Sequence, residues 1–219
     1  RSGLRRLLRR RGNATADRQL PSHALRGQVA SAIHRAVLER NWGGAANLAR
    51  LCTYYAHSGL IVLRSVIDPA YELGVGSIRL RVSPDWYWQV GLLDDDVRQG
   101  EFHCWIRRDH GGGRQEVIDF TSRYYRQLAE TCGLPWDRTD TPPFVWGWLD
   151  EVASRHKLQL ACDPPRAERL AELLNDEDRR RIEEIAASAM LYFSDTTVLQ
   201  RIPSPLSAAE LDLHPSTPA

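Results

Sequence analysis

Apolar residues recur every four positions near the start of the chain, at Leu25, Val29, Ile33 and Val37. That spacing places them on one face of a helix. Ser22 stands just before the pattern, where its hydroxyl can accept a hydrogen bond from an unpaired backbone N–H group. The sequence therefore predicts an amphipathic helix that begins after Ser22.

The next apolar segment contains more than one pattern. The run AANLARLCTYYAHSGL, residues 45–60, keeps a helical spacing, and we expect Gly59 to end this helix. The following run LIVLRSVI, residues 60–67, is short and mostly apolar, which is typical of a buried strand. Polar and apolar residues then alternate in SIRLRV, residues 77–82, and predict a strand with one buried face.

The rest of the chain continues with strands and ends with helices. We expect two strands around the turn DHGGGRQ, a helix in SRYYRQLAETCG, a proline- and tryptophan-rich connector over residues 134–152, and two helices between residues 164 and 193. Helices, a meander of strands and helices again indicate an α+β domain. We expect a basic flexible segment, an α+β core, a C-terminal helical segment and a flexible tail, at residues 1–20, 21–160, 161–201 and 202–219.

Composition and charge restrict the function classes. The 219 residues are 42% hydrophobic and 26% charged with a net charge of +1, as in an ordinary globular protein. Arginines cluster before Gly12 without aromatic residues among them, which argues against a nucleic-acid partner. No apolar run approaches the ~20 residues of a membrane-spanning helix. The four cysteines form no C-x-x-C pair, which argues against a structural zinc site and favours a cytoplasmic protein with reduced thiols.

A histidine and an aspartate lie on either side of the glycine-rich turn, in the segment FHCWIRRDHGGGRQEVIDFT. If the hairpin turns at Gly111, His103 and Asp119 are directly opposite each other, with their side chains on the same face of the sheet. A carboxylate in that place accepts a hydrogen bond from the imidazole and favours its protonated form.

Two interpretations of this pair follow from the spacing. The pair could orient a catalytic imidazole, or it could be an ordinary ion pair on a solvated sheet face. Phe102, Cys104 and Ile106 alternate with the pair and predict that the core lies on the opposite face. Trp105 and Val117 share the face of the pair, which favours a partly covered cleft there.

The segments HCWIR and EVIDFT resemble the histidine and aspartate motifs of the transglutaminase-like superfamily of papain-like thiol enzymes. The resemblance extends over residues 41–125 and implies a transglutaminase-like core, with N-terminal helices packed on an antiparallel sheet. It implies that His103 is the general base and that Asp119 orients the imidazole. In this family a cysteine attacks an amide carbonyl, and the acyl group passes to water or to an amine. The implied partner is a peptide or protein substrate, and no metal or organic cofactor is implied.

The same resemblance places the nucleophile at Ala45, just after Gly43 and Gly44, at the expected start of a helix. A helix N-terminus stabilises a thiolate and a developing oxyanion, and Asn41 and Trp42 could add oxyanion-binding donors there. Alanine cannot attack a carbonyl. The chain is therefore expected to be inactive in this form, either through a Cys-to-Ala substitution or as a natural peptide-binding pseudoenzyme on the same fold.

The cysteines that are present are less suited to the role by their positions. Cys52 lies about 10 Å further along the expected helix than residue 45, and burial there raises the pKa of a thiol. It is expected to be a small core residue. Cys104 alternates away from the imidazole, and Cys132 and Cys162 have no histidine placed to activate them.

Overall fold

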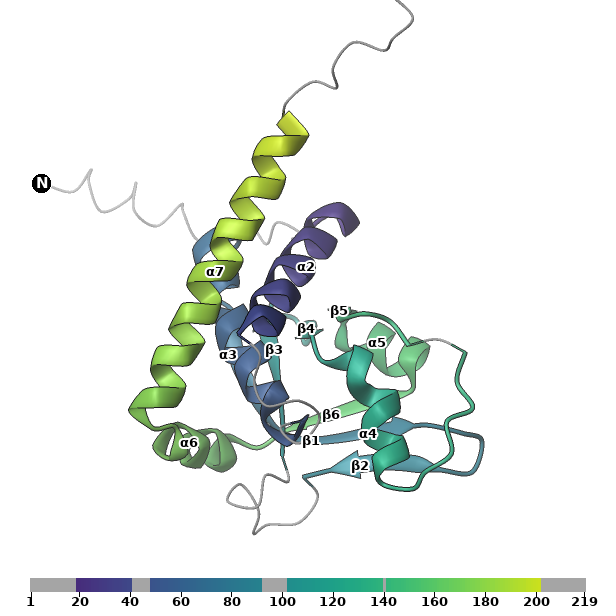
Figure 1. The fold of residues 1–219 in the computed structure, drawn as a ribbon. Helices are drawn as coiled ribbons and strands as arrows, with labels where there is room; N and C mark the ends of the chain where they lie inside the picture. Colours follow the sequence, from purple (N-terminus) through teal and green to yellow (C-terminus); the bar gives the residue numbers. More distant parts are fainter. Residues whose placement is uncertain (1–18, 41–47, 92–101, 140, 202–219) are drawn as a thin grey trace, which may run out of the picture.

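The computed structural model describes residues 19–40, 48–91, 102–139 and 141–201 (Figure 1). This part of the chain forms an α+β fold with a six-stranded antiparallel sheet and six α-helices, which confirms the expected fold class. The elements in chain order are α2 (His23–Glu39), α3 (Leu48–Val66), β1 (Glu72–Arg81), β2 (Tyr87–Val90), β3 (His103–Asp109), β4 (Gln115–Asp119), the short 3-10 helix η3 (Ser122–Tyr124), α4 (Tyr125–Thr131), β5 (Val145–Trp148), α5 (Leu149–His156), β6 (Leu158–Cys162), α6 (Pro164–Leu173) and α7 (Asp176–Arg201).

The sheet has the strand order β2-β1-β3-β4-β5, and β6 also pairs with β1. Both β2 and β6 pair with Ile78, so they lie on opposite edges of β1. Both β3 and β6 pair with Gly76, so β3 also lies opposite β6. It follows that β3 and β2 lie one after the other along the same edge of β1. His103, the first residue of β3, lies where the pairing of β1 with β3 stops and its pairing with β2 begins.

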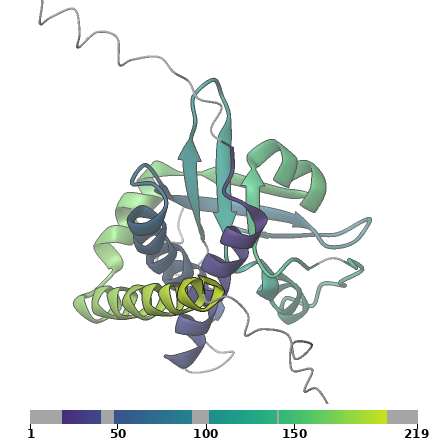
Figure 2. The ribbon, with the colours of Figure 1, turned by 90° about the horizontal axis from the view of Figure 1, so that it is seen from above.

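Helices cover both faces of the sheet (Figures 1 and 2). Helices α2, α3 and α7 pack together on one face, and α4 and α5 pack on the other. Each face has its own hydrophobic cluster. The first cluster includes Val29, Ile33, Val62, Leu63, Cys104, Ile106, Ile118, Phe120 and Ile185. The second includes Ile78, Leu80, Val82, Trp88, Trp105, Val117, Tyr125, Val145 and Val152.

The N-terminal helix forms as its pattern predicts. The backbone N–H of Leu25 donates to the Ser22 hydroxyl over 3.2 Å, which confirms the predicted cap of α2. The apolar face of α2 packs against α7, and Arg40 pairs with Glu184 over 3.0 Å at the end of this contact. Helix α7 also packs on α3, so the three helices share the first cluster. No helix in the described residues is long and apolar enough to cross a membrane.

The strand expected over residues 60–67 is wrong, because α3 continues through this run to Val66. Gly59 does not end the helix. A Cβ atom on Gly59 would lie 2.7 Å from Cε2 of Phe120, so the missing side chain lets the helix approach the sheet closely. Leu60, Val62 and Leu63 are all buried. A helix buried on most sides has no polar stripe, and its apolar run therefore resembles a strand in the sequence.

The connector expected over residues 134–152 also contains regular structure. Residues 145–148 form β5, and α5 follows directly at Leu149. All four residues of β5 are buried, so polar and apolar residues do not alternate along it. Strand β6 was not expected either. It is five residues long and mostly exposed, so it gives no clear periodic signal.

Candidate active site

The β3–β4 hairpin brings His103 and Asp119 together in a register that differs from the expected one. Arg107 pairs with Val117, which centres the turn one residue later than Gly111. The three turn glycines all have positive φ angles, of 80°, 62° and 79°, and this backbone favours glycine. His103 and Asp119 therefore lie diagonally on the same face rather than directly opposite each other. The residue paired with a given position on β3 differs by two from the expected one, and a shift of two keeps both side chains on one face.

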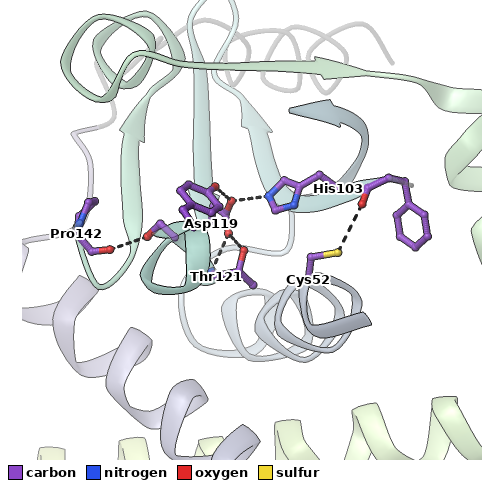
Figure 3. A network of polar contacts seen from close by, with 8 residues as sticks. Cys52, His103, Asp119, Thr121 and Pro142 are labelled. Atoms are coloured by element: carbon purple, nitrogen blue, oxygen red, sulfur yellow. Dashed lines mark hydrogen bonds and ion pairs between the residues drawn. The ribbon is translucent and has the colours of Figure 1, made fainter. Parts of the chain in front are cut away.

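His103 and Asp119 form a short hydrogen bond. Nε2 of the imidazole lies 2.6 Å from Oδ2 of the carboxylate (Figure 3). Only 4% of His103 and 2% of Asp119 are exposed. The second hydrophobic cluster packs on the sheet face that carries them, and the partly covered cleft expected on this face stays a prediction.

Four donors hold the Asp119 carboxylate. Its Oδ1 accepts hydrogen bonds from the backbone N–H and the hydroxyl of Thr121, over 2.7 and 2.5 Å. Its Oδ2 accepts one from the hydroxyl of Tyr125 in addition to the one from His103. The carboxylate can be buried because its lone pairs are filled.

The chain after β4 explains how these donors reach Asp119. It turns directly into η3 and then α4, so residues two and six positions later return to the carboxylate. The hydroxyl of Ser122 donates to the backbone oxygen of Pro142 over 2.8 Å and fixes this turn against the segment before β5 (Figure 3). The segment DFTSRYY, residues 119–125, therefore contains the last residue of β4, Asp119, together with two of its donors, Thr121 and Tyr125.

Cys52 lies on α3 and directs its thiol towards the backbone at the start of β3 (Figure 3). Its Sγ atom is 4.0 Å from the backbone oxygen of Phe102, the residue before His103. The thiol interacts electrostatically with the side chains of both His103 and Cys104. Since Nε2 of the imidazole faces Asp119, Nδ1 is the nitrogen that remains for Cys52. The three side chains thus form the series thiol, imidazole, carboxylate.

Electrostatics favour an ion pair between the thiol and the imidazole. A hydrogen bond with Cys104 lowers the pKa of Cys52 well below that of an ordinary thiol, burial opposes this shift, and His103 adds to it. Burial lowers the pKa of His103, but the charge and hydrogen bond of Asp119, together with Cys52, raise it to about 10. Burial raises the pKa of Asp119, but His103, Thr121 and Tyr125 hold it below its usual value. These shifts together favour a thiolate beside an imidazolium, with the Asp119 carboxylate ionised.

A second imidazole–carboxylate pair lies on the same hairpin. Nε2 of His110 is 2.8 Å from Oε2 of Glu116, and the Glu116 side chain is 1% exposed. The other oxygen of Glu116 accepts hydrogen bonds from the hydroxyl of Tyr71, over 3.1 Å, and the indole N–H of Trp146, over 2.6 Å. The His110 ring packs edge-on against Trp148, with the ring centroids 4.8 Å apart. These contacts hold the hairpin between β1 and β5.

The structure brings together two of the site residues predicted from the sequence, His103 and Asp119. Ala45, Asn41 and Trp42 lie outside the described residues, so their roles stay predictions. Cys52 is a buried core residue, as expected, with 6% of its surface exposed. Its contact with the imidazole was not expected.

A sequence signal for the orientation of Cys52 does exist. Cys52, Ala56, Gly59 and Leu63 follow one another at intervals of four, three and four residues. These small and apolar residues form the helix face that approaches the sheet, so the thiol had to point towards β3. Cys104 lies on the opposite side of β3 from the imidazole, as expected, but its thiol also contacts Cys52.

The described residues contain no group of three His, Cys, Asp or Glu side chains that could hold a metal ion.

Comparison with known proteins gives one likeness. No protein-family model matches the chain, and no curated protein matches it. A crystal structure described as that of genomics APC5867 superposes with a TM-score of 0.45 and 15% sequence identity, over 79% of this chain and 80% of that chain.

Proposed function

We propose that the chain is a transglutaminase-like thiol enzyme in which Cys52, rather than a residue at position 45, is the nucleophile. One observation carries the proposal. The Cys52 thiol interacts electrostatically with the His103 imidazole, whose Nε2 is hydrogen-bonded to the buried carboxylate of Asp119. This series supplies the nucleophile, the proton carrier and the group that orients it. The proposal also agrees with the sequence resemblance in the roles of His103 and Asp119.

The first half of the reaction forms a thioester. The Cys52 thiolate attacks the carbonyl carbon of a peptide or side-chain amide, and the carbonyl oxygen takes up the negative charge. The His103 imidazolium then gives its Nδ1 proton to the amide nitrogen, the C–N bond breaks, and an amine leaves. Asp119 keeps its bond to Nε2 throughout, so the imidazole stays aligned with the sulfur.

The second half releases the acyl group. Neutral His103 takes a proton from water or from an amine as that molecule attacks the thioester carbon. The C–S bond breaks, the thiolate returns, and the product is an acid or a new amide. The enzyme is a hydrolase if water attacks and an acyltransferase if an amine attacks.

The burial of the site favours a second candidate function. Cys52, His103 and Asp119 are at most 6% exposed, so a substrate carbonyl reaches the sulfur only if a covering segment moves. Without such a movement, the triad would be a structural element of a peptide-binding module on the same fold. The two functions differ in whether a small electrophile reaches Cys52.

Alkylation by iodoacetamide tests the proposal, with the extent at each cysteine measured by peptide mass spectrometry. Cys132 and Cys162 are exposed and serve as internal standards in the same chain. At pH 6 we expect Cys52 to react about tenfold faster than either standard, because its lowered pKa leaves a larger fraction of thiolate. His103→Ala should remove this difference and leave both standards unchanged. A Cys52 that reacts more slowly than both standards between pH 5 and 9, whether or not His103 is present, would rule out the enzyme.

A further inference from the structure

Tyr125 lies beside the Cys52–His103–Asp119 triad and binds its carboxylate. Its hydroxyl donates to Oδ2 of Asp119, the same oxygen that binds Nε2 of His103. This oxygen thus lies between two donors, one from β3 and one from the start of α4. The other oxygen is held by Thr121 alone.

The ring of Tyr125 also fixes the surroundings of the imidazole. It stands edge-on to the His103 ring, with centroids 6.1 Å apart and planes at 61°. It also packs against Trp88 of β2, with centroids 5.6 Å apart. Tyr125 is 3% exposed, so neither contact competes with solvent. These ring contacts hold Tyr125 in the position from which its hydroxyl donates to the carboxylate.

We propose that Tyr125 is a positioning residue, which holds Oδ2 of Asp119 in the orientation that the imidazole needs and keeps the carboxylate ionised through the reaction. This inference rests on the proposed function and adds a fourth member to its machinery. Tyr125 acts through Asp119 and does not touch the reacting atoms.

The reaction itself shows why a second donor is needed. His103 changes from imidazolium to neutral imidazole when it gives a proton to the leaving amine, so the charge that stabilises the carboxylate disappears at this step. A buried carboxylate without enough donors takes up a proton instead. Tyr125 keeps its proton throughout, because burial and the charge of Asp119 raise its pKa well above the usual value. Its hydrogen bond is therefore constant while that of His103 weakens.

The alternative is that Tyr125 only fills the second hydrophobic cluster. Phenylalanine would fill the same space and keep the contact with Trp88, so Tyr125→Phe separates the two explanations. Tyr124 offers a matched control, because its hydroxyl forms a hydrogen bond of 3.3 Å with the hydroxyl of Tyr55 on α3 rather than with Asp119. Tyr124→Phe removes one hydroxyl from the neighbouring residue of the same chain segment.

The experiment measures the rate of Cys52 alkylation by iodoacetamide from pH 4 to 9 in wild type, Tyr125→Phe, Tyr124→Phe and His103→Ala. The loss of one donor should make Asp119 easier to protonate. We expect the acid-side midpoint of Cys52 reactivity in Tyr125→Phe to rise by about half to one pH unit, and the rate at pH 5 to fall several-fold. Tyr124→Phe should keep the wild-type midpoint. Circular dichroism verifies that each variant is folded.

The outcomes separate this inference from the proposed function. If His103→Ala abolishes the fast reaction while Tyr125→Phe keeps the wild-type midpoint, Tyr125 is a packing residue and the enzyme proposal stands. If the wild type shows no fast Cys52 reaction, the proposed function fails first. A folded Tyr125→Phe that only lowers the thermal midpoint, with an unchanged pH profile, also overturns the positioning role.

Discussion

The β3–β4 hairpin carries two imidazole–carboxylate pairs with nearly equal geometry and different surroundings. His103–Asp119 spans 2.6 Å and His110–Glu116 spans 2.8 Å, and in both pairs the carboxylate is 1% exposed. The first pair faces a thiol. The second faces a tyrosine hydroxyl and two indole rings. A buried, charge-assisted hydrogen bond is therefore not by itself evidence of a catalytic site.

The difference lies in what each pair is connected to. Glu116 joins the hairpin to the residue before β1 and to β5, so its contacts all serve to hold three segments together. Asp119 accepts hydrogen bonds from the end of its own strand and stabilises the protonated form of His103. His103 in turn interacts with the sulfur atom of Cys52 on α3. The His110–Glu116 pair therefore contacts groups that hold the fold together. The His103–Asp119 pair contacts a sulfur atom that can form a covalent bond.

Replacing each carboxylate by its amide should give the largest difference between the pairs, measured as the alkylation rate of Cys52. Asp119→Asn replaces the charge that stabilises the imidazolium, so the Cys52 thiolate loses its partner. We expect the alkylation rate of Cys52 at pH 6 to fall about 100-fold. Glu116→Gln, the matched control, should change this rate less than about twofold. Equal losses in both variants would mean that the thiol responds to the stability of the hairpin and not to His103.

The stability of the same two variants should not separate the pairs. Both substitutions weaken a charge-assisted hydrogen bond in a buried network, and each should lower the free energy of unfolding by about 2 kcal/mol. Urea unfolding followed by tryptophan fluorescence measures this change. A Glu116→Gln variant as stable as the wild type would contradict the structural role assigned to Glu116.

Stability against pH gives a smaller test of the ion pair. The ion pair implies that folded Cys52 and His103 together bind one proton, which lies on His103. The reason is that the pKa of Cys52 is lowered well below 9.0 and that of His103 is raised from 6.5 to about 10. In the unfolded chain these groups also hold one proton between pH 6.5 and 9.0. Their joint contribution to the free energy of unfolding is therefore flat across this window.

Cys52→Ala should remove that balance. The raised pKa of His103 then stabilises the fold fully below pH 6.5, and this contribution is lost as the pH rises through the folded value. We expect the free energy of unfolding of the variant to fall with pH above 6.5, by up to about 1.4 kcal/mol per unit, relative to the wild type. Urea unfolding at pH values from 6 to 9 gives the slopes. Parallel curves for the two proteins would show that the folded thiol is neutral.

Much of the fold could be predicted from local pattern. The α+β class, the helix after Ser22 and the β3–β4 hairpin all follow from periodicity and turn residues. The continuation of α3 through Leu60, Val62 and Leu63, and strand β5, could not be predicted, because these buried residues carry no alternation between polar and apolar positions.

The site could be predicted in part for a similar reason. His103 and Asp119 are close in sequence, and a two-residue error in register leaves both on one face, so their contact does not depend on the exact turn. The place of Cys52 depends on how α3 packs across the sheet, 51 residues before His103. Distance along a helix axis alone does not give the distance to a strand that crosses it.

The close approach at Gly59 has a consequence for the sulfur, two helical turns away. Phe120 and Ile106 occupy the space that a side chain at this position would need, with contacts of 2.7 and 3.0 Å to a Cβ atom. These two residues belong to the segments that carry Asp119 and His103. The spacing between α3 and the sheet, and with it the reach of the thiol, is thus set by the absence of a single carbon atom at a position that touches none of the reacting groups.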